Sequence, residues 1–255
     1  MFTELQTLRT AARDGWANRG SFLLQVTFMV ANDVVWIIFW ALFFGKVGTV
    51  RGWMLSDVLL LFATITVSAG IAFGVFANCR RIGQLAGMGE LDETLVLPVS
   101  PLRHILAKRI NAANIGDMVF GLGLFAVAGD PTPERTALFL AGCIGGTVVL
   151  ISFIVLVGSL SFFFGGEGQQ GDAAFNAIIL FASYPIDFFG GATKILLYTA
   201  VPAAFVTGVP VSLVRHFDSV LALEYLAVSG TLAMLASVVF TLGLRRYSSG
   251  SAWVR

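Results

Sequence analysis

Four long apolar runs with almost no charge constrain this chain more than any other feature. They cover residues 22–44, 58–76, 136–164 and 220–244. About 20 consecutive apolar residues are enough for a helix to cross the hydrocarbon core of a bilayer. Only 12% of the 255 residues are charged and 57% are hydrophobic, whereas about a quarter of the residues in soluble domains are charged. The sequence therefore predicts an all-α integral membrane protein, because a helix satisfies its own backbone hydrogen bonds in lipid.

Two less regular runs complete a set of six predicted transmembrane helices. Residues 111–129 begin with polar side chains, and residues 173–189 end in a Tyr184-Pro185 break. Residues 190–214 are apolar but interrupted by glycine and proline, which favours a re-entrant helical hairpin before the last span. One further kinked span is the alternative. The candidate hinge residues are Tyr184, Pro185, Gly190, Gly191, Pro202 and Pro210.

The positions of Lys and Arg predict the orientation, because positively charged loops stay cytoplasmic. With six spans, the inner segments hold eleven basic residues and the outer segments hold five. Both termini are therefore expected in the cytoplasm. Residues 1–20 place apolar side chains at helical spacing and are expected to form an interfacial helix, with a frayed polar tail as the alternative. Residues 21–255 then form a single transmembrane domain.

Charged side chains are rare within the predicted spans, and Asp33 beside Asn32 lies deepest. A buried charge in a membrane usually faces protein or an aqueous path. Asn32 and Asp33 are therefore candidates for a pathway or a subunit contact, and a satisfied structural hydrogen bond is the alternative. Asp117, Asp187 and Glu224 lie nearer span ends and are expected to be reached by water.

The sequence contains no pattern that indicates catalysis or a bound cofactor. Gly45-Lys46 lacks the upstream glycine of an ATP-binding P-loop. Two histidines without an HExxH motif, and the isolated Cys79 and Cys143, predict no catalytic residue and no metal site. The net charge of +1 argues against nucleic acid as a partner.

The inner loop, residues 80–109, is the strongest candidate for a partner contact. Its residues 89–102 combine an acidic cluster with leucines and two prolines. Leucines that face water need a partner, so we expect the leucines to provide apolar contacts with a soluble protein and the carboxylates to orient it. Ser100-Pro101 predicts a helix start, and this helix is expected to run into the third span. The candidate docking residues are Gly89, Glu90, Leu91, Asp92, Glu93, Leu95, Leu97, Pro98 and Pro101.

At this loop the sequence resembles the permease subunits of the ABC type-2 family, in a bacterial half-size branch with a Gly-x-Leu-Asp-x-x-Leu-x-x-Pro signature. Gly89, Leu91, Asp92, Leu95 and Pro98 match that signature. The resemblance extends over nearly the whole chain, including Gly48…Gly52-Trp53, Tyr184-Pro185, the Val-Pro-Ala-Ala-Phe segment at 201–205 and the ending at 245–251.

This resemblance implies six spans, an N-terminal interfacial helix, a coupling helix in the inner loop and a re-entrant hairpin. It also implies two permeases, identical or related, assembled with two cytoplasmic ABC ATPase chains that hold ATP and Mg. The expected function is an exporter in the bacterial cytoplasmic membrane, in contact with lipids. Because few charges lie in the spans, an amphiphilic, lipid-like or drug-like cargo is expected. The alternatives are a non-transporting assembly or immunity protein and a proton-coupled carrier.

Overall fold

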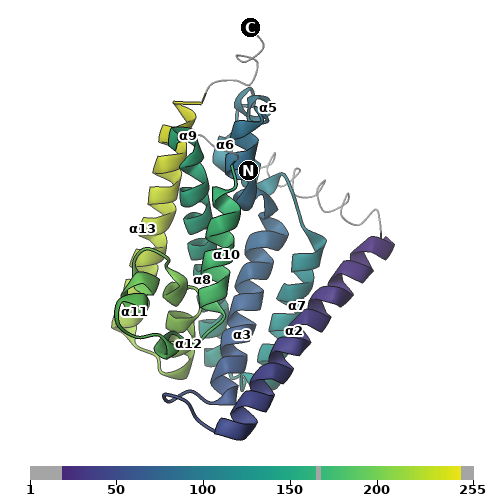
Figure 1. The fold of residues 1–255 in the computed structure, drawn as a ribbon, viewed down its shortest axis with the longest axis vertical. Helices are drawn as coiled ribbons and strands as arrows, with labels where there is room; N and C mark the ends of the chain where they lie inside the picture. The colour runs from purple at the N-terminus through teal and green to yellow at the C-terminus, as the bar shows by residue number, and fades with distance from the viewer. Residues whose placement is uncertain (1–18, 165–167, 248–255) are drawn as a thin grey trace.

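The computed structural model describes residues 19–164 and 168–247, and every regular element within these ranges is a helix, with no strand. One isolated bridge joins Val50 and Trp53 in a turn. The helices form an elongated bundle with its loops at two opposite ends (Figure 1). The all-α fold class predicted from the sequence is confirmed. The predicted interfacial helix at residues 1–20 lies almost entirely outside the described residues.

Four helices are long and apolar enough to cross a membrane, as the four strongest runs predict. They are α2 (Arg19–Val47), α3 (Leu55–Ala69) with its π-helical continuation η1 (Gly70–Val75), α8 (Pro133–Ser159) and α13 (Ser219–Leu244). Local capping explains two of the starts. Thr132 Oγ1 accepts a hydrogen bond from Arg135 N before Pro133, and Asp218 Oδ1 accepts one from Val220 N.

Two shorter helices complete the bundle. α7 (Ala112–Ala128) packs against α2 and α3, and α10 (Gln170–Ala182) packs against α8. α10 ends seven residues before the predicted end of its span at 189, because the chain turns at Pro185 into the 3-10 turn η3 (Ile186–Phe188). The helices that lie side by side between the two ends of the molecule are thus α2, α3, α7, α8, α10 and α13 (Figure 1).

Glycines set the close approach of α3 to α7. A Cβ at Gly70 would lie 2.6 Å from the backbone N of Met118, and one at Gly121 would lie 2.3 Å from Thr66 Oγ1. Small residues allow membrane helices to pack at this separation. Close approach recurs on α8, where a Cβ at Gly142 would lie 2.9 Å from Pro210 and one at Gly146 would lie 2.8 Å from both Ser68 Oγ and Val206 O.

The bent hairpin comprises α11 (Gly191–Tyr198), the 3-10 turn η4 (Ala203–Phe205) and α12 (Gly208–Arg215), with a bend of 63° between its arms. Both of its ends contact the 51–57 segment. At the start, the Arg51 guanidinium donates to Asp187 O at 2.7 Å. At the finish, Arg215 Nε lies 3.1 Å from Asp57 Oδ1. Both ends of the hairpin therefore lie at one end of the bundle, here called the hairpin end, which favours a re-entrant hairpin over a crossing span.

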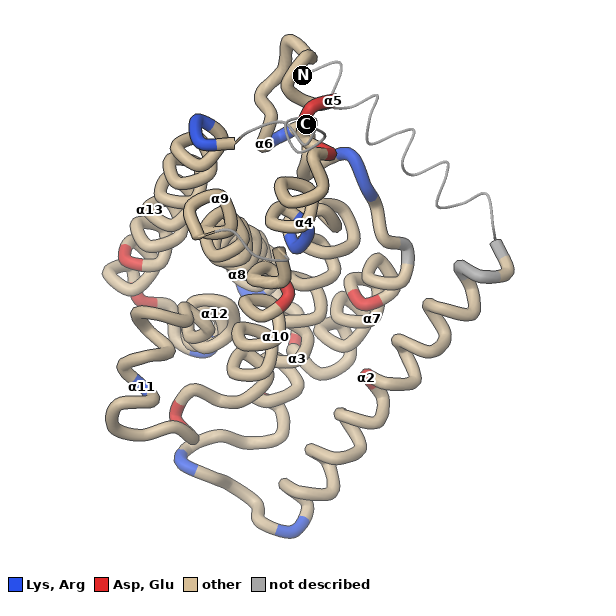
Figure 2. Tube along the Cα trace, turned by 45° about the horizontal axis from the view of Figure 1, so that its top comes forward, with Lys and Arg blue, Asp and Glu red and all other residues tan. Residues whose placement is uncertain are grey.

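The inner loop folds at the opposite end, here called the terminal end, where α2 begins and α13 finishes (Figure 1). It contains η2 (Ala77–Arg81), α4 (Ile82–Gly87), α5 (Asp92–Leu95) and α6 (Pro101–Ala107). The prediction that α6 runs into the next span is wrong. Residues 108–111 separate the two helices, and Asn111 caps α7 by accepting from Ala113 N. Charged residues gather mainly at the two ends of the bundle (Figure 2).

The hairpin arrangement predicts a labelling pattern in intact cells. We expect a membrane-impermeant maleimide to label both Gly190→Cys and His216→Cys from outside, because both exposed positions flank the hairpin at its single end. Met88→Cys, exposed at the terminal end, is the matched control and should react only after permeabilisation. The native Cys79 and Cys143 are buried and should give little background. Labelling of Gly190→Cys and His216→Cys from opposite sides would show a crossing span instead.

Candidate functional site

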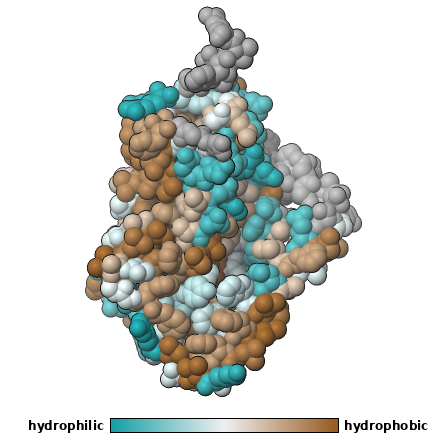
Figure 3. Space-filling view, viewed as in Figure 1, coloured by the Kyte–Doolittle hydropathy of each residue, from teal (hydrophilic) through white to brown (hydrophobic). Residues whose placement is uncertain are grey.

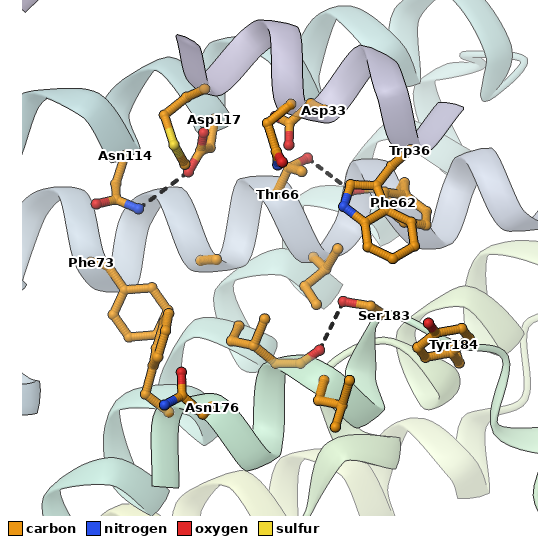
Figure 4. Close-up of a pocket in the computed structure, with 17 residues that line it drawn as sticks. Asp33, Trp36, Phe62, Thr66, Phe73, Asn114, Asp117, Asn176, Ser183 and Tyr184 are labelled. Carbon is orange, nitrogen blue, oxygen red and sulfur yellow. Dashed lines mark hydrogen bonds between the residues drawn. The ribbon is translucent and has the colours of Figure 1, made fainter. Parts of the chain in front are cut away.

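A half-open cavity of about 380 Å³ lies between α2, α3 and α7 on one side and α10 on the other (Figure 4). We call it the membrane cavity. α2 leans away from the other helices toward the terminal end (Figure 1). The cavity walls are largely apolar, with amide and carboxylate groups among them. The lining residues are Met29, Asn32, Asp33, Trp36, Phe62, Ile65, Thr66, Ala69, Phe73, Asn114, Asp117, Phe175, Asn176, Ile179, Leu180, Ser183 and Tyr184.

Two carboxylates face this cavity from different helices, Asp33 from α2 and Asp117 from α7 (Figure 4). Their relative exposures are only 7% and 6%. Asn114 Nδ2 donates to Asp117 Oδ2 at 3.2 Å. The oxygens Asp33 Oδ2 and Asp117 Oδ1 have no hydrogen-bond partner among the described residues.

The structure corrects the interpretation of Asp117. Sequence position near a span end predicts contact with water, but α2 packs across the first turns of α7 and buries this side chain. A Cβ at the neighbouring Gly116 would lie 3.1 Å from Val26 Cγ1, which shows how closely the two helices approach. The available signal was Asn114 three residues before Asp117, since residues at this spacing share one helix face.

The other two helix-end acids lie away from the cavity. Asp187 forms an ion pair with Lys194 at 2.7 Å and accepts from Trp53 Nε1 at 3.1 Å, at the hairpin end. Glu224 is exposed near the start of α13.

An ion pair between the inner loop and α10 lies next to the cavity wall. Arg80, in η2, lies 2.8 Å from Asp172 of α10, and its guanidinium carbon lies 3.7 Å from the ring centroid of Phe175. Phe175 meets Phe73 edge to face, with centroids 4.8 Å apart, and both rings line the membrane cavity. Arg80 therefore connects the inner loop directly to the cavity wall.

The candidate hinge residues divide between the cavity and the hairpin. Tyr184 lines the cavity and packs edge to face on Trp36 and Trp40. Gly191, at the start of α11, has a φ of +54° that favours glycine. Pro210, in the first turn of α12, would lie 2.9 Å from a Cβ at Gly142 of α8. Pro185, Gly190 and Pro202 occupy the turns between these helices.

The predicted docking residues lie together at the terminal end, in a compact helical element. Gly89 has a φ of +76° and ends α4 in a turn, and Pro101 begins α6. Lys108 and Glu93 form an exposed ion pair at 3.2 Å. Asn78 Nδ2 donates to Ile105 O at 3.0 Å, which ties α6 to η2.

The exposed apolar residues of this element form what we call the docking tip. Its members are Met88, Leu95, Val96, Leu97 and Pro98. Leu91 was expected to contact a partner, but it is 1% exposed and packs in the core of the chain itself. Leu91 lies just before α5 and belongs to the same core cluster as Leu85 of α4 and Ile105 of α6. Sequence reasoning missed Met88 and Val96, which are more exposed than either leucine of the tip.

Asp92 connects the docking element to the end of the last long helix. Tyr247 Oη donates to Asp92 Oδ1 at 2.9 Å. Burial, this hydrogen bond and the nearby carboxylate charge raise the pKa of Tyr247 to about 12. The phenol therefore stays protonated and keeps donating at physiological pH.

The apolar helical bundle, the partly polar cavity and the docking element define a multi-pass membrane protein. A family model described as ABC-2 family transporter protein matches residues 30–251. The chain belongs to this family. It is therefore a membrane permease subunit of an ABC transporter, a class that works with a separate ABC ATPase. No curated protein and no solved structure matched the chain in the other two comparisons.

Proposed function

We propose that this permease belongs to an ATP-driven exporter that moves amphiphilic, lipid-like or drug-like molecules across the bacterial cytoplasmic membrane. The observation that carries the proposal is the membrane cavity, whose apolar walls hold a few polar groups between α2 and α10. Ligand sites commonly combine an apolar lining with a small number of placed polar groups. Figure 3 shows apolar and polar residues side by side on this face of the molecule.

The exposed apolar surfaces of the chain indicate its partners. The docking tip contacts a cytoplasmic ABC ATPase, which holds ATP and Mg, and both termini lie in the cytoplasm. α2 and α13 keep most of their apolar surface exposed in the single chain. Lipids and a second permease, identical or related, cover that surface.

The coupling route runs from the docking tip through η2 to the cavity. ATP-driven closure of the ATPase pair moves the inner loop, and Arg80 transmits the movement to Asp172 and Phe175 on α10. The cargo responds to this change only if it binds the two states of the cavity with different affinity.

The proposal predicts that an ABC ATPase co-purifies with the tagged full-length permease from native membranes. Mass spectrometry of the purified complex identifies its chains. Reconstituted vesicles should then transport a fluorescent lipid analogue only with ATP and Mg present. A permease that purifies without any ATPase, or transport that proceeds without nucleotide, would contradict the proposal.

A proton-coupled carrier is the second candidate, and the buried Asp33 and Asp117 favour it. Buried carboxylates in membrane helices serve as proton relays in carriers. Transport driven by an imposed pH gradient in vesicles without nucleotide distinguishes this mechanism from the ATP-driven one.

A further inference from the structure

The membrane cavity carries acidic side chains without basic ones. Among the described residues that line it, Asp33 and Asp117 are the only carboxylic acids, and none is Lys, Arg or His. Arg80, which stacks on the lining residue Phe175, is paired with Asp172 at 2.8 Å. No described basic group therefore compensates the two carboxylates from within the cavity wall.

The two carboxylates also keep unused hydrogen-bonding capacity. Both side chains are more than nine-tenths buried, and Asp33 Oδ2 and Asp117 Oδ1 accept no hydrogen bond from the described residues. Leaving a buried polar atom unpaired is costly. A ligand with N–H donors would supply hydrogen bonds to these oxygens, and a cation without donors would compensate their charge.

Aromatic rings surround this acidic position. Trp36, Phe62 and Tyr184 lie toward one side of the cavity and Phe73 toward the other (Figure 4). Phe73 meets Phe175, on which Arg80 of the inner loop stacks. Ring faces attract cations, most strongly when water is excluded. The volume of about 380 Å³ lies within the range of drug-sized ligand sites.

We infer that the membrane cavity binds an organic cation with bulky apolar groups, its charge held by Asp33 and Asp117 and its apolar part held between the aromatic rings. A bare metal ion fits poorly, because hard divalent cations need about six oxygen ligands and most of this lining is apolar. The inference deepens the proposed function, on which it rests, by naming the charge class of the cargo.

The first test uses two probes of the same shape and opposite charge, tetraphenylphosphonium and tetraphenylborate. Each is titrated into the full-length wild-type permease in nanodiscs of neutral lipid, with binding followed by equilibrium dialysis and by quenching of tryptophan fluorescence. We expect saturable binding of the phosphonium and at least about tenfold weaker binding of the borate. Equal binding of both probes would show a merely apolar cavity, and no binding of the phosphonium would overturn the inference directly.

The second test removes the charges with little change in shape. Asp33→Asn together with Asp117→Asn should weaken phosphonium binding about tenfold or more, and should narrow its difference from the borate. Glu224→Gln, which removes an exposed carboxylate on α13, is the matched control and should bind as the wild type does. Unchanged binding by the double variant would place the cation elsewhere and overturn the assignment.

The cation-binding inference and the proposed exporter function fail in different experiments. If only the charge class of the cargo is wrong, the wild type does not bind the phosphonium, but the ATPase still co-purifies and lipid transport still depends on nucleotide. Failure of ATPase co-purification overturns the proposed function and leaves the binding result standing. If the double variant does not elute as a folded protein, the probe comparison on the wild type still decides the charge class.

Discussion

Val96→Asp should release the ATPase from the permease without removing the permease from the membrane. Val96 is the most exposed apolar side chain of the docking tip, at 81% exposure, so its replacement disturbs no packing within the chain. In a complex, the same position would place an unpaired carboxylate against an apolar partner surface. That cost is about 2 kcal/mol or more, which corresponds to a loss of affinity of roughly thirtyfold.

The measurement is the amount of ATPase that co-purifies with equal amounts of membrane-inserted permease. Val127→Asp is the matched control, because it makes the same substitution at a more exposed position at the other end of the bundle. It should leave the ATPase bound. Equal ATPase recovery with Val96→Asp and wild type would remove the docking tip from the interface.

Milder substitutions in the same element should weaken ATPase binding to different extents. Leu95→Ala removes an apolar anchor and should cost more than about 1 kcal/mol of binding free energy, whereas Glu93→Ala, at the rim, should cost less. Leu91→Ala should act differently, by destabilising the permease, because Leu91 is buried within the chain. The melting temperature of the purified permease separates these two effects.

Arg80→Gln should uncouple ATP hydrolysis from transport. Arg80 joins the inner loop to α10 through Asp172 and through the ring of Phe175. The ion pair is more than a third exposed on both sides, so it contributes at most about 1 kcal/mol to stability, and the variant should fold. We expect ATP hydrolysis to continue while lipid transport falls about tenfold, because movement of the inner loop no longer reaches the cavity wall.

Lys108→Gln provides the matched control for Arg80→Gln. It breaks the exposed ion pair between Glu93 of α5 and Lys108 at the end of α6, both within the same loop. Transport per ATP hydrolysed should stay at the wild-type value in this variant. Parallel loss of hydrolysis and transport in Arg80→Gln would point to a role in ATPase binding and would contradict the coupling role.

Much of the architecture could be predicted because the bilayer limits the length and composition of each spanning helix, and both can be read from the sequence. The four long apolar runs appear as long helices, with Thr132-Pro133 starting α8 as its capping pattern indicates. Glycine and proline at 190–214 predicted the bent hairpin, because neither residue supports a continuous helix there. These features depend on composition, length and local backbone preference, which can be read along the sequence.

The sequence by itself determined the helical membrane class, the principal spans and the element that projects from the bundle. Tertiary structure alone decided which polar groups share a cavity and which leucines remain exposed. Asp117 lies with Asp33 at one cavity because α2 packs across α7. Leu91, just before α5, packs into the core of the chain, whereas Val96, just after α5, stays exposed. The Arg80–Asp172 pair joins residues 92 positions apart. Such contacts depend on the packing of distant helices, and no local periodicity encodes which helix lies against which neighbour.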